Sequence, residues 1–383
     1  MYLNDKNIDK YLYYWLIVMF ILVSSIIIVG GLTRLTDSGL SITQWELIKG
    51  FIPPLSKSEW DNYFSLYKQI PEYKLQNFDM TINEFKIIFW WEWAHRFLAR
   101  IIGLFFFIPL IYFSYKKGIS QTKSLFLIFL LICFQGFLGR LIGLSFLIPL
   151  IYFSFKINFT KLFSLYFIFL LICFQGFIGW YMVSSGLVDR VDVSHFRLSI
   201  HLLGAFAILS LIYWNYLRIN TNLIIDKPIN KFLPLLLLVL VFIQITIGAF
   251  VSGMDAGTIY NSWPKMGLNY FPDDNKYSNL LKMSAFSDPS LVQFMHRNIA
   301  YIILFFYVYL FYYIRKNKIS FLYKIIYLIG LLLILQIFLG ILTLLYGAQI
   351  KIASMHQISS IFLVSSVIYF LYINNNSNLR PLS

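Results

Sequence analysis

Long apolar runs separated by short polar connections dominate this chain. A helix needs about 20 apolar residues to cross the hydrocarbon of a bilayer, and ten runs approach or exceed that length. Their backbone must be paired internally in lipid, and the runs are too long and too uniformly apolar for barrel strands. We therefore predict an all-α polytopic membrane protein. Its ten expected spans are residues 12–32, 94–115, 122–139, 140–156, 161–183, 198–217, 231–253, 294–314, 319–346 and 352–373.

Composition supports this fold class and excludes one class of partner. Of the 383 residues, 59% are hydrophobic and only 13% are charged, about half the charged share of a soluble domain. The net charge of +14 resides mostly in short connections, where it reports topology and not nucleic-acid binding. The surroundings we expect are membrane lipid. Cys133 and Cys173 lie inside apolar runs and are expected in the core.

The basic residues also predict orientation. Connections 116–123, 156–161, 218–231 and 315–324 hold twelve Lys and Arg, whereas the alternate connections 139–140, 184–197 and 347–351 hold four. By the positive-inside rule the N-terminus is cytoplasmic, and the long connections 33–93 and 254–293 face outward. The start MYLNDKNIDK has no targeting character, which favours a bacterial plasma (inner) membrane.

Two repeats organise the chain. Residues 101–140 and 141–180 are a near-identical tandem duplication, which adds one hairpin and preserves orientation. An older repeat relates AHRFLARIIGLFF to MHRNIAYIILFF, and LSIHLLGAFAILS to ASMHQISSIFLVSS. We predict two pseudosymmetric four-helix transmembrane bundles, residues 1–220 and 221–383, with the duplicated hairpin extra to the first. The helices before the later histidines share Gln-x-x-x-Gly at Gln175/Gly179 and Gln336/Gly340.

Four histidines occupy matched places near the outward ends of apolar segments: His95, His201, His296 and His356. An ionisable group at membrane depth is costly and usually functional, and neutral imidazole is a common axial ligand of haem iron. We predict two bis-histidine haem sites at similar depth, one in each bundle. A buried polar residue bonded across helices is the alternative for any single histidine. Zinc is weaker, because no Cys, Asp or Glu surrounds all four.

Charged neighbours distinguish the two sites. Glu92 precedes His95 by three residues and shares its helix face, whereas the second half has Gln293 at that place. Glu92 is a candidate general base or stabiliser of a cation, or else it orients the histidine. Arg96 and Arg297 follow two of the histidines and are candidate partners of haem propionates, with snorkelling to lipid phosphate as the alternative.

Three further features have simpler interpretations. Trp90, Trp91 and Trp93 are expected to form an interfacial belt. His195, in VDVSHFR, is expected to be an exposed loop residue. The outward segment GGLTRLTDSGLSITQW (30–45) predicts a structured turn with Arg34 at the interface, and GAFVSGMDAGTIYNSWPKMG (248–267) is its looser counterpart.

At these residues the chain resembles haem A synthases of the proteobacterial and mitochondrial type. The resemblance covers nearly the whole chain apart from one copy of the 40-residue repeat. It implies an enzyme that oxidises the C8 methyl of haem O to a formyl group by successive hydroxylations, for cytochrome oxidase biogenesis. The stretches that carry it are GGLTRLTDSGLSITQW, residues 58–96, SIHLLGAF, GAFVSGMDAGTIYNSWPKMG and QFMHRNIAY.

The resemblance also implies roles for single residues. His95 and His201 would hold the substrate haem, His296 and His356 a haem b cofactor, and Glu92 would be the catalytic carboxylate. A haem O synthase and an electron acceptor are the implied partners, and a homo-oligomer is compatible with the sequence. A non-catalytic di-haem b cytochrome in quinol electron transfer is the alternative function. The inserted hairpin falls between His95 and His201, so it bears on the geometry of the substrate site.

Overall fold

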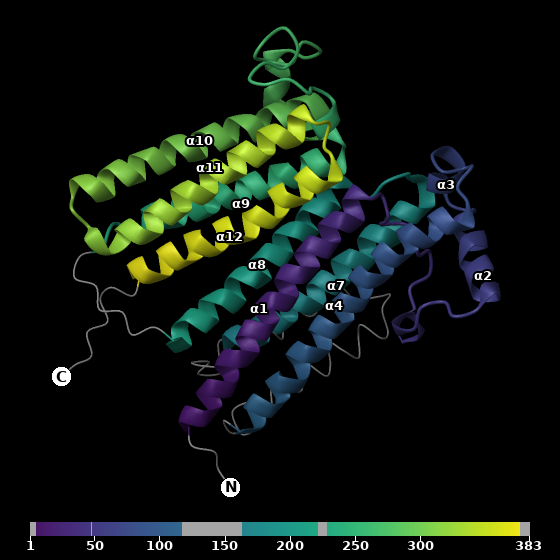
Figure 1. Cartoon of the computed structure of the whole chain (residues 1–383), viewed down its shortest axis with the longest axis horizontal. Coiled ribbons are helices and arrows are strands. Elements are labelled where there is room, and N and C mark those ends of the chain that lie inside the picture. The colour runs from purple at the N-terminus through teal and green to yellow at the C-terminus, as the bar shows by residue number, and fades with distance from the viewer. Residues whose placement is uncertain (1–4, 47, 117–162, 221–227, 376–383) are drawn as a thin grey trace.

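The computed structural model of this protein describes residues 5–46, 48–116, 163–220 and 228–375. The described part is helical, with short 3-10 turns in the connections and no strand (Figure 1). Eight of its helices are long and apolar enough to cross a membrane, which confirms a polytopic membrane protein. These are α1 (Asp5–Leu35), α4 (Ile82–Lys116), α7 (Phe163–Asp189), α8 (His195–Asn220), α9 (Phe232–Gly253), α10 (Pro289–Lys316), α11 (Tyr323–Leu345) and α12 (Ile350–Asn375). The predicted spans 122–139 and 140–156 lie outside the described residues.

The eight long helices form two groups of four (Figure 1). In the first, α1 and α7 each pack against both α4 and α8, so α4 and α8 face one another across the bundle. In the second, α9 and α11 each pack against both α10 and α12, which places α10 and α12 on the corresponding diagonal. Helices α1, α8, α9 and α12 make the contacts between the two groups.

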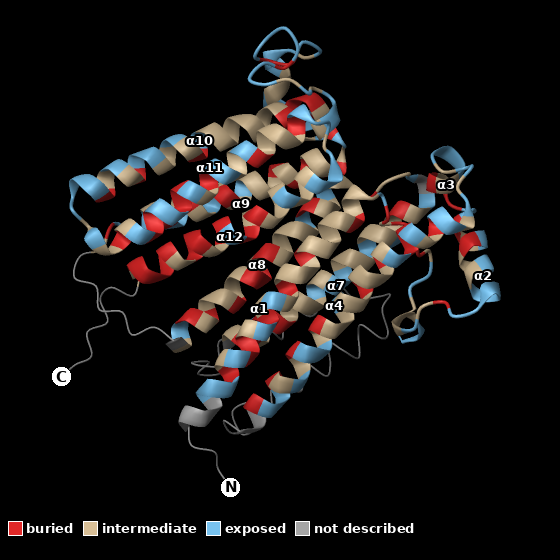
Figure 2. Cartoon of the chain, viewed as in Figure 1, coloured by how far each residue is buried: buried red, intermediate tan, exposed pale blue. Residues whose placement is uncertain are grey.

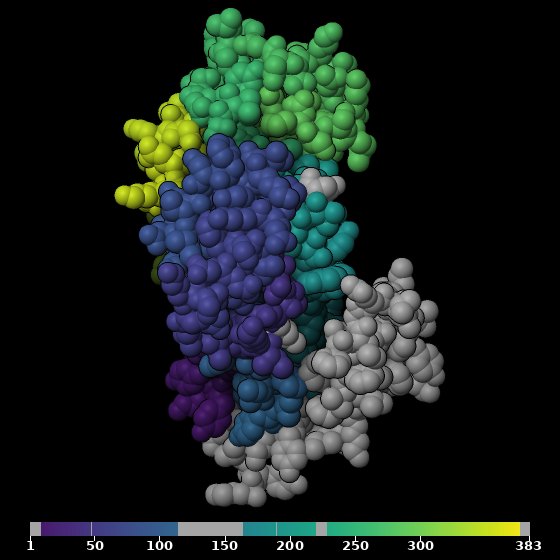
Figure 3. Space-filling view, turned by 90° about the vertical axis from the view of Figure 1, so that its right-hand side faces the viewer, coloured from purple at the N-terminus to yellow at the C-terminus, as the bar shows by residue number. Residues whose placement is uncertain are grey.

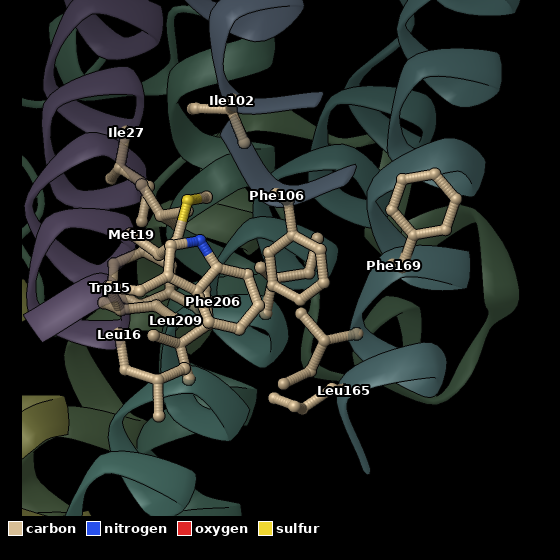
Figure 4. Packing of buried hydrophobic residues seen from close by; sticks show 14 of the residues in the cluster. Trp15, Leu16, Met19, Ile27, Ile102, Phe106, Leu165, Phe169, Phe206 and Leu209 are labelled. Atoms are coloured by element: carbon tan, nitrogen blue, oxygen red, sulfur yellow. The ribbon is translucent and has the colours of Figure 1, made fainter. Parts of the chain in front are cut away.

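Apolar packing crosses the boundary between the two groups. One buried cluster joins α1, α4, α7 and α8 around side chains such as Trp15, Phe106 and Phe206 (Figure 4) and extends to residues of α9 and α12. The Trp15 indole nitrogen donates to the Phe105 carbonyl at 2.9 Å, so the polar edge of this ring is paired within the apolar cluster. A second cluster joins α9, α10, α11 and α12 and includes Leu217 of α8. Burial is greatest along α12, and the outer faces of the other spans stay exposed, as lipid-facing surfaces do (Figure 2).

Helix α4 begins at Ile82, twelve residues before the predicted span at 94–115. Its extra turns project beyond the ends of the neighbouring spans and pack against α2 (Lys57–Tyr67), where Phe64 stacks on Phe85. A short helix, α3 (Pro71–Leu75), completes this outer segment. The aromatic residues of the predicted loop therefore extend a transmembrane helix, which apolar run length alone could not indicate.

The two outward connections begin with matching turns. Asp37 and Asp255 each take a positive φ, 47° and 51°, in the sequences DSG and DAG that follow α1 and α9. Arg34, at the end of α1, forms an ion pair with Asp255 at 2.8 Å and another with Asp37. This arginine, expected at the interface, joins the outer surfaces of the two helix groups.

Candidate functional site

The four histidines lie at one depth in the helix bundle. His201, His296 and His356 follow the first residues of α8, α10 and α12 by six, seven and six positions. At about 1.5 Å per residue they lie ~10 Å inside the outer helix ends. His95 is thirteen residues into α4, because α4 extends outward by about two additional turns.

Each histidine ring packs against a glycine of the helix that precedes its own. A Cβ built on Gly30 would lie 2.8 Å from Cε1 of His95. Matching distances are 3.1 Å from Gly179 to His201, 3.0 Å from Gly248 to His296 and 3.1 Å from Gly340 to His356. A Cβ at Gly30 would collide with the His95 ring, and at the other three positions the ring would have to move by a few tenths of an ångström. Glycine therefore serves close packing of the ring here and not a backbone turn.

The first pair of rings is close enough to share one metal atom. The ring centroids of His95 and His201 are 6.3 Å apart and their planes are inclined by 66°. A metal–imidazole bond is about 2.0 Å, so two rings bound to opposite sides of one metal have centroids on the order of 6 Å apart. In the second bundle, His296 is close enough to His356 for the charge of one ring to affect the other.

One ring nitrogen of each histidine has no protein partner, which is compatible with a metal-bearing ligand such as an iron porphyrin. In all four, Nδ1 is buried without a hydrogen-bond partner, and each ring retains some accessible surface. Such orphaned polar atoms are rare in folded proteins and indicate a missing group. Within the described residues there is no cluster of three or more His, Cys, Asp or Glu side chains of the kind that holds other metals. The ligand roles predicted from the sequence stay predictions.

Glutamines restrain three of the four histidines. Gln175 donates from Nε2 to the backbone carbonyl of His201, Gln244 to that of His296 at 3.0 Å, and Gln336 to that of His356 at 3.0 Å. Each glutamine lies four residues before the glycine that packs on the same ring. Sequence analysis found this spacing in α7 and α11 but missed Gln244/Gly248 in α9.

Glu92 and Arg96 form a buried ion pair under the outer segment. Arg96 donates from Nε and Nη2 to Oε1 of Glu92, at 3.0 and 2.6 Å. The other carboxylate oxygen accepts from the Ser41 hydroxyl and the Ile42 amide, both at 2.7 Å. Arg96 also donates to the carbonyls of Ile42 and Gln44. The pair therefore holds residues 41–44 against α4, and Arg96 has its donors committed to protein groups.

The second half has a weaker counterpart of this pair. Gln293 donates to the Tyr260 carbonyl at 3.1 Å, and its own Oε1 is buried without a partner. Arg297 donates to the carbonyls of Tyr260, Ser262 and Lys265. Arg96 and Arg297, which were predicted to contact propionates, thus donate to loop carbonyls. At this position the two halves differ in the Glu92 carboxylate, which Gln293 replaces in the second half.

Another buried carboxyl lies in the outer segment. Glu72, on α3, is 3% exposed and accepts from the Tyr67 hydroxyl at 2.9 Å. Burial raises the pKa of the Glu72 carboxyl to about 8, and burial also raises the pKa of the Tyr67 hydroxyl. This pair packs within the aromatic cluster of α2 and the start of α4, so its role is in the fold of the segment.

Two simpler expectations met different outcomes. His195 is not an exposed loop residue: it opens α8, is partly buried, and packs edge-on to Phe250 of α9 at 5.5 Å. The helix begins earlier than its apolar run, because the interface with α9 orders this turn. Of the tryptophans, Trp90 is exposed and Trp93 stacks on Phe97; the interfacial belt stays a prediction.

Comparison with known proteins gives one consistent family. The family described as cytochrome oxidase assembly protein matches residues 13–141 and 137–368. The two matches meet where the first copy of the 40-residue duplication ends and the second begins.

Curated relatives that are matched over nearly their full length carry one name. A "Heme A synthase" of Pelagibacter ubique (strain HTCC1062) is 45% identical over 380 residues, which is 99% of this chain and 100% of the relative. The one from Rickettsia bellii (strain OSU 85-389) is 40% identical, covering 97% and 100%. That of Rickettsia felis is 37% identical, covering 95% and 98%. The similarity therefore spans both helix groups and both outer connections.

Proposed function

This chain belongs to the haem A synthase family of cytochrome oxidase assembly proteins, and from that membership we propose how its two bundles divide the work. The protein is an oxidoreductase of the membrane that acts on haem O, converting its C8 methyl to a formyl group. Its relatives favour this activity over a non-catalytic di-haem cytochrome. The division between the bundles, described next, is the proposal.

The substrate haem is assigned to the N-terminal bundle, residues 1–220, with His95 and His201 as its ligands. The observation that carries this assignment is the asymmetry at one buried position: Glu92 beside His95, and Gln293 beside His296. A haem that undergoes oxidation needs an acid–base or electrostatic group nearby, whereas a resident cofactor does not. The 6.3 Å separation of the His95 and His201 rings supports a ligand pair.

The C-terminal bundle, residues 221–383, is assigned a resident haem b with His296 and His356 as ligands. Both rings have the glycine contact, the orphaned Nδ1 and the glutamine bond described above. When bound, the haem supplies the electron-transfer chemistry of the reaction. The chain's own residues hold the rings in place and keep water away from the site.

Glu92 is proposed as the catalytic carboxylate, with a condition set by its contacts. Its two oxygens accept from Arg96, Ser41 and Ile42, so it is held rigidly. As a fixed negative charge it can stabilise positive charge that develops on the substrate. To transfer a proton it must first give up one of these contacts, and the Ser41 hydroxyl, which can rotate, is the one most easily released.

Orientation and partners complete the proposal. The charge of the connections supports a cytoplasmic N-terminus in a bacterial inner membrane, with both haem sites toward the periplasmic side. A haem O synthase would supply the substrate, and a separate electron acceptor would take the electrons.

Pigment extraction tests the division of roles. The chain is expressed beside a haem O synthase, and haems are extracted from membranes of wild type, His95→Ala and His296→Ala. We expect haem A in wild type, resident haem b but no haem A in His95→Ala, and loss of resident haem b in His296→Ala. Haem A in the His95→Ala membranes would remove the N-terminal bundle from its assigned role.

A further inference from the structure

The outer segment that follows α1 descends along the side of α4. Arg100 donates from Nη1 to the Gly50 carbonyl at 3.1 Å and from Nη2 to the Glu46 carbonyl at 3.0 Å. Its guanidinium also lies over the Phe51 ring. Arg100 is five residues further into the bundle than His95, so the segment reaches well below the outer end of α4.

The depth of this segment follows from helix geometry. The other three histidines lie ~10 Å inside the outer helix ends, and His95 shares their depth. Arg100 Cα lies ~7.5 Å deeper still. Long side chains on a helix lean toward its N-terminus, which for α4 is the outer end, so Gly50 and Glu46 lie about level with His95. Non-helical backbone is therefore present at a depth where the neighbouring helices are apolar.

Arginines provide the partners that such backbone needs. Irregular backbone within the hydrocarbon region requires internal hydrogen bonds. The guanidiniums of Arg96 and Arg100 provide them to four carbonyls of the segment, those of Ile42, Gln44, Glu46 and Gly50. Together with the Glu92 carboxylate, which pairs with Arg96, these carbonyls account for the two cations on α4.

The outward side of the segment is apolar. Ile48 is 83% exposed, Ile52 64% and Leu55 80%, and Trp45 is exposed beside them. Figure 3 shows the described residues between α1 and α4 as a blue surface on this face of the molecule. In water these side chains would be unfavourable, whereas in lipid each is stabilised. Lys49 is long enough to extend its ammonium toward the headgroups.

We propose that the described residues 44–46 and 48–55 form a re-entrant segment that contacts bilayer hydrocarbon through Ile48, Ile52 and Leu55, with Arg96 and Arg100 pairing its backbone. The partner of this surface is lipid acyl chain. The inference is independent of the assignment of the two haem sites, since it rests on depth, exposure and backbone pairing alone.

Spin-label accessibility tests the segment in the full chain. Ile48→Cys and Leu75→Cys are made with both native cysteines replaced, labelled with a nitroxide and placed in phosphatidylcholine nanodiscs. Leu75 is the matched control: it is apolar, 71% exposed and in the same connection, but lies near the outer end of α4. We expect the label at 48 to favour collision with oxygen, and the label at 75 to favour a water-soluble nickel chelate. Equal nickel accessibility at both positions would overturn the proposal.

A second inference comes from the glutamine contacts and deepens the proposed function, on which it rests. Three ligand histidines have a glutamine bonded to their own carbonyl, but the corresponding position for His95, four residues before Gly30, is Ile26. The Ile26 side chain has no hydrogen-bond donor, so it cannot make the matching contact with the His95 carbonyl. His95 therefore lacks the glutamine contact that the other three histidines share.

We infer that Gln175, Gln244 and Gln336 are positioning residues, and that Ile26 leaves His95 free to shift when the substrate haem exchanges. A substrate must leave as product after each turnover, whereas a resident cofactor stays. The histidine that lacks the glutamine contact lies in the bundle assigned to the substrate. In the C-terminal bundle both histidines have this helix-to-helix hydrogen bond, which fits a site that need not open, whereas in the N-terminal bundle only His201 has it.

Haem transfer to an excess of apomyoglobin tests this inference on purified protein loaded with haem. Ile26→Gln installs the missing donor, and Ile26→Met, similar in shape but without a donor, is its matched control. We expect Ile26→Gln to slow haem loss from the N-terminal site about five-fold, the factor that one typical net hydrogen bond provides. Ile26→Met should release haem as wild type does, and the C-terminal rate should not change in either variant.

The outcomes separate this inference from the proposed function. If wild type binds haem through His95 and Ile26→Gln releases it at the wild-type rate, the inference fails and the assignment of the sites stands. If the visible spectrum of wild type shows no haem that depends on His95, the proposed function fails, and this inference with it.

Discussion

Replacing Glu92 by glutamine tests the geometry of the buried ion pair most directly. The carboxylate accepts four hydrogen bonds, two from Arg96 and one each from Ser41 and Ile42. An amide has only one oxygen. Whichever way it turns, its NH₂ group faces another donor, either the Arg96 guanidinium or the Ile42 amide.

The expected cost is large because both partners are buried, with Glu92 2% and Arg96 8% exposed. Removing one partner of a buried ion pair typically costs about 3–5 kcal/mol, since the other charge remains without compensation. The contacts at risk hold residues 41–44 to α4, so the loss is expected as local opening of the outer segment. Each 1.4 kcal/mol is a factor of ten, which predicts opening about two to three and a half orders of magnitude more frequent.

Limited trypsin digestion in nanodiscs measures this opening, because cleavage of a transiently open segment follows its equilibrium population. Cleavage after Lys49 should accelerate strongly in Glu92→Gln, while cleavage after Lys265 in the other connection should not change. Gln293→Met is the matched control. It loses one hydrogen bond to the Tyr260 carbonyl, which still accepts from Arg297. About 1 kcal/mol is expected there, less than a ten-fold effect.

The refuting result is specific. If Glu92→Gln is digested at Lys49 as slowly as wild type and yet forms no haem A, the carboxylate acts on the substrate without anchoring the segment. The structural argument above is then wrong, and the chemical role stands alone.

Three further predictions concern the rings and the outer segment. Gly248→Val should displace the His296 ring and abolish the low-spin haem spectrum of the C-terminal site, whereas Gly103→Val, which meets no atom within 4 Å, should not. His95→Ala should leave that spectrum intact, as measured by reduced-minus-oxidised difference spectroscopy. Burial holds the Glu72 pKa at about 8, above its ordinary 4.5. The folded segment therefore binds this proton more tightly than the unfolded chain does. The stability of the segment falls as pH rises from about 4.5 through about 8. Glu72→Gln should abolish that fall, as measured by protease protection over a series of pH values.

Some features of the structure were predictable because they depend on local sequence. Run length and composition predict the spans, and all eight long helices of the described part coincide with predicted ones. Helix ends were less predictable. The start of α4 at Ile82 depends on Phe85 packing against Phe64 of α2, a contact between distant segments that hydropathy does not register.

The candidate site divides in the same way. Repeat spacing placed one histidine on the second and fourth helices of each half, and their shared depth follows from residue counts along the helices. The sequence could not indicate that Arg96 binds loop carbonyls, because its partners Ile42 and Gln44 are some fifty residues away. The motif at Gln244/Gly248 was visible but carried no meaning until its contact with His296 was known.

The sequence by itself therefore determined a helical membrane protein, its repeat and the identity of four unusual histidines, because lipid imposes length and polarity on each span separately. Only the tertiary structure decided what surrounds them. Glycine contacts, glutamine bonds and the buried pair of Glu92 and Arg96 all join different helices or loops. Such contacts depend on how helices cross and at what height, which no single span encodes.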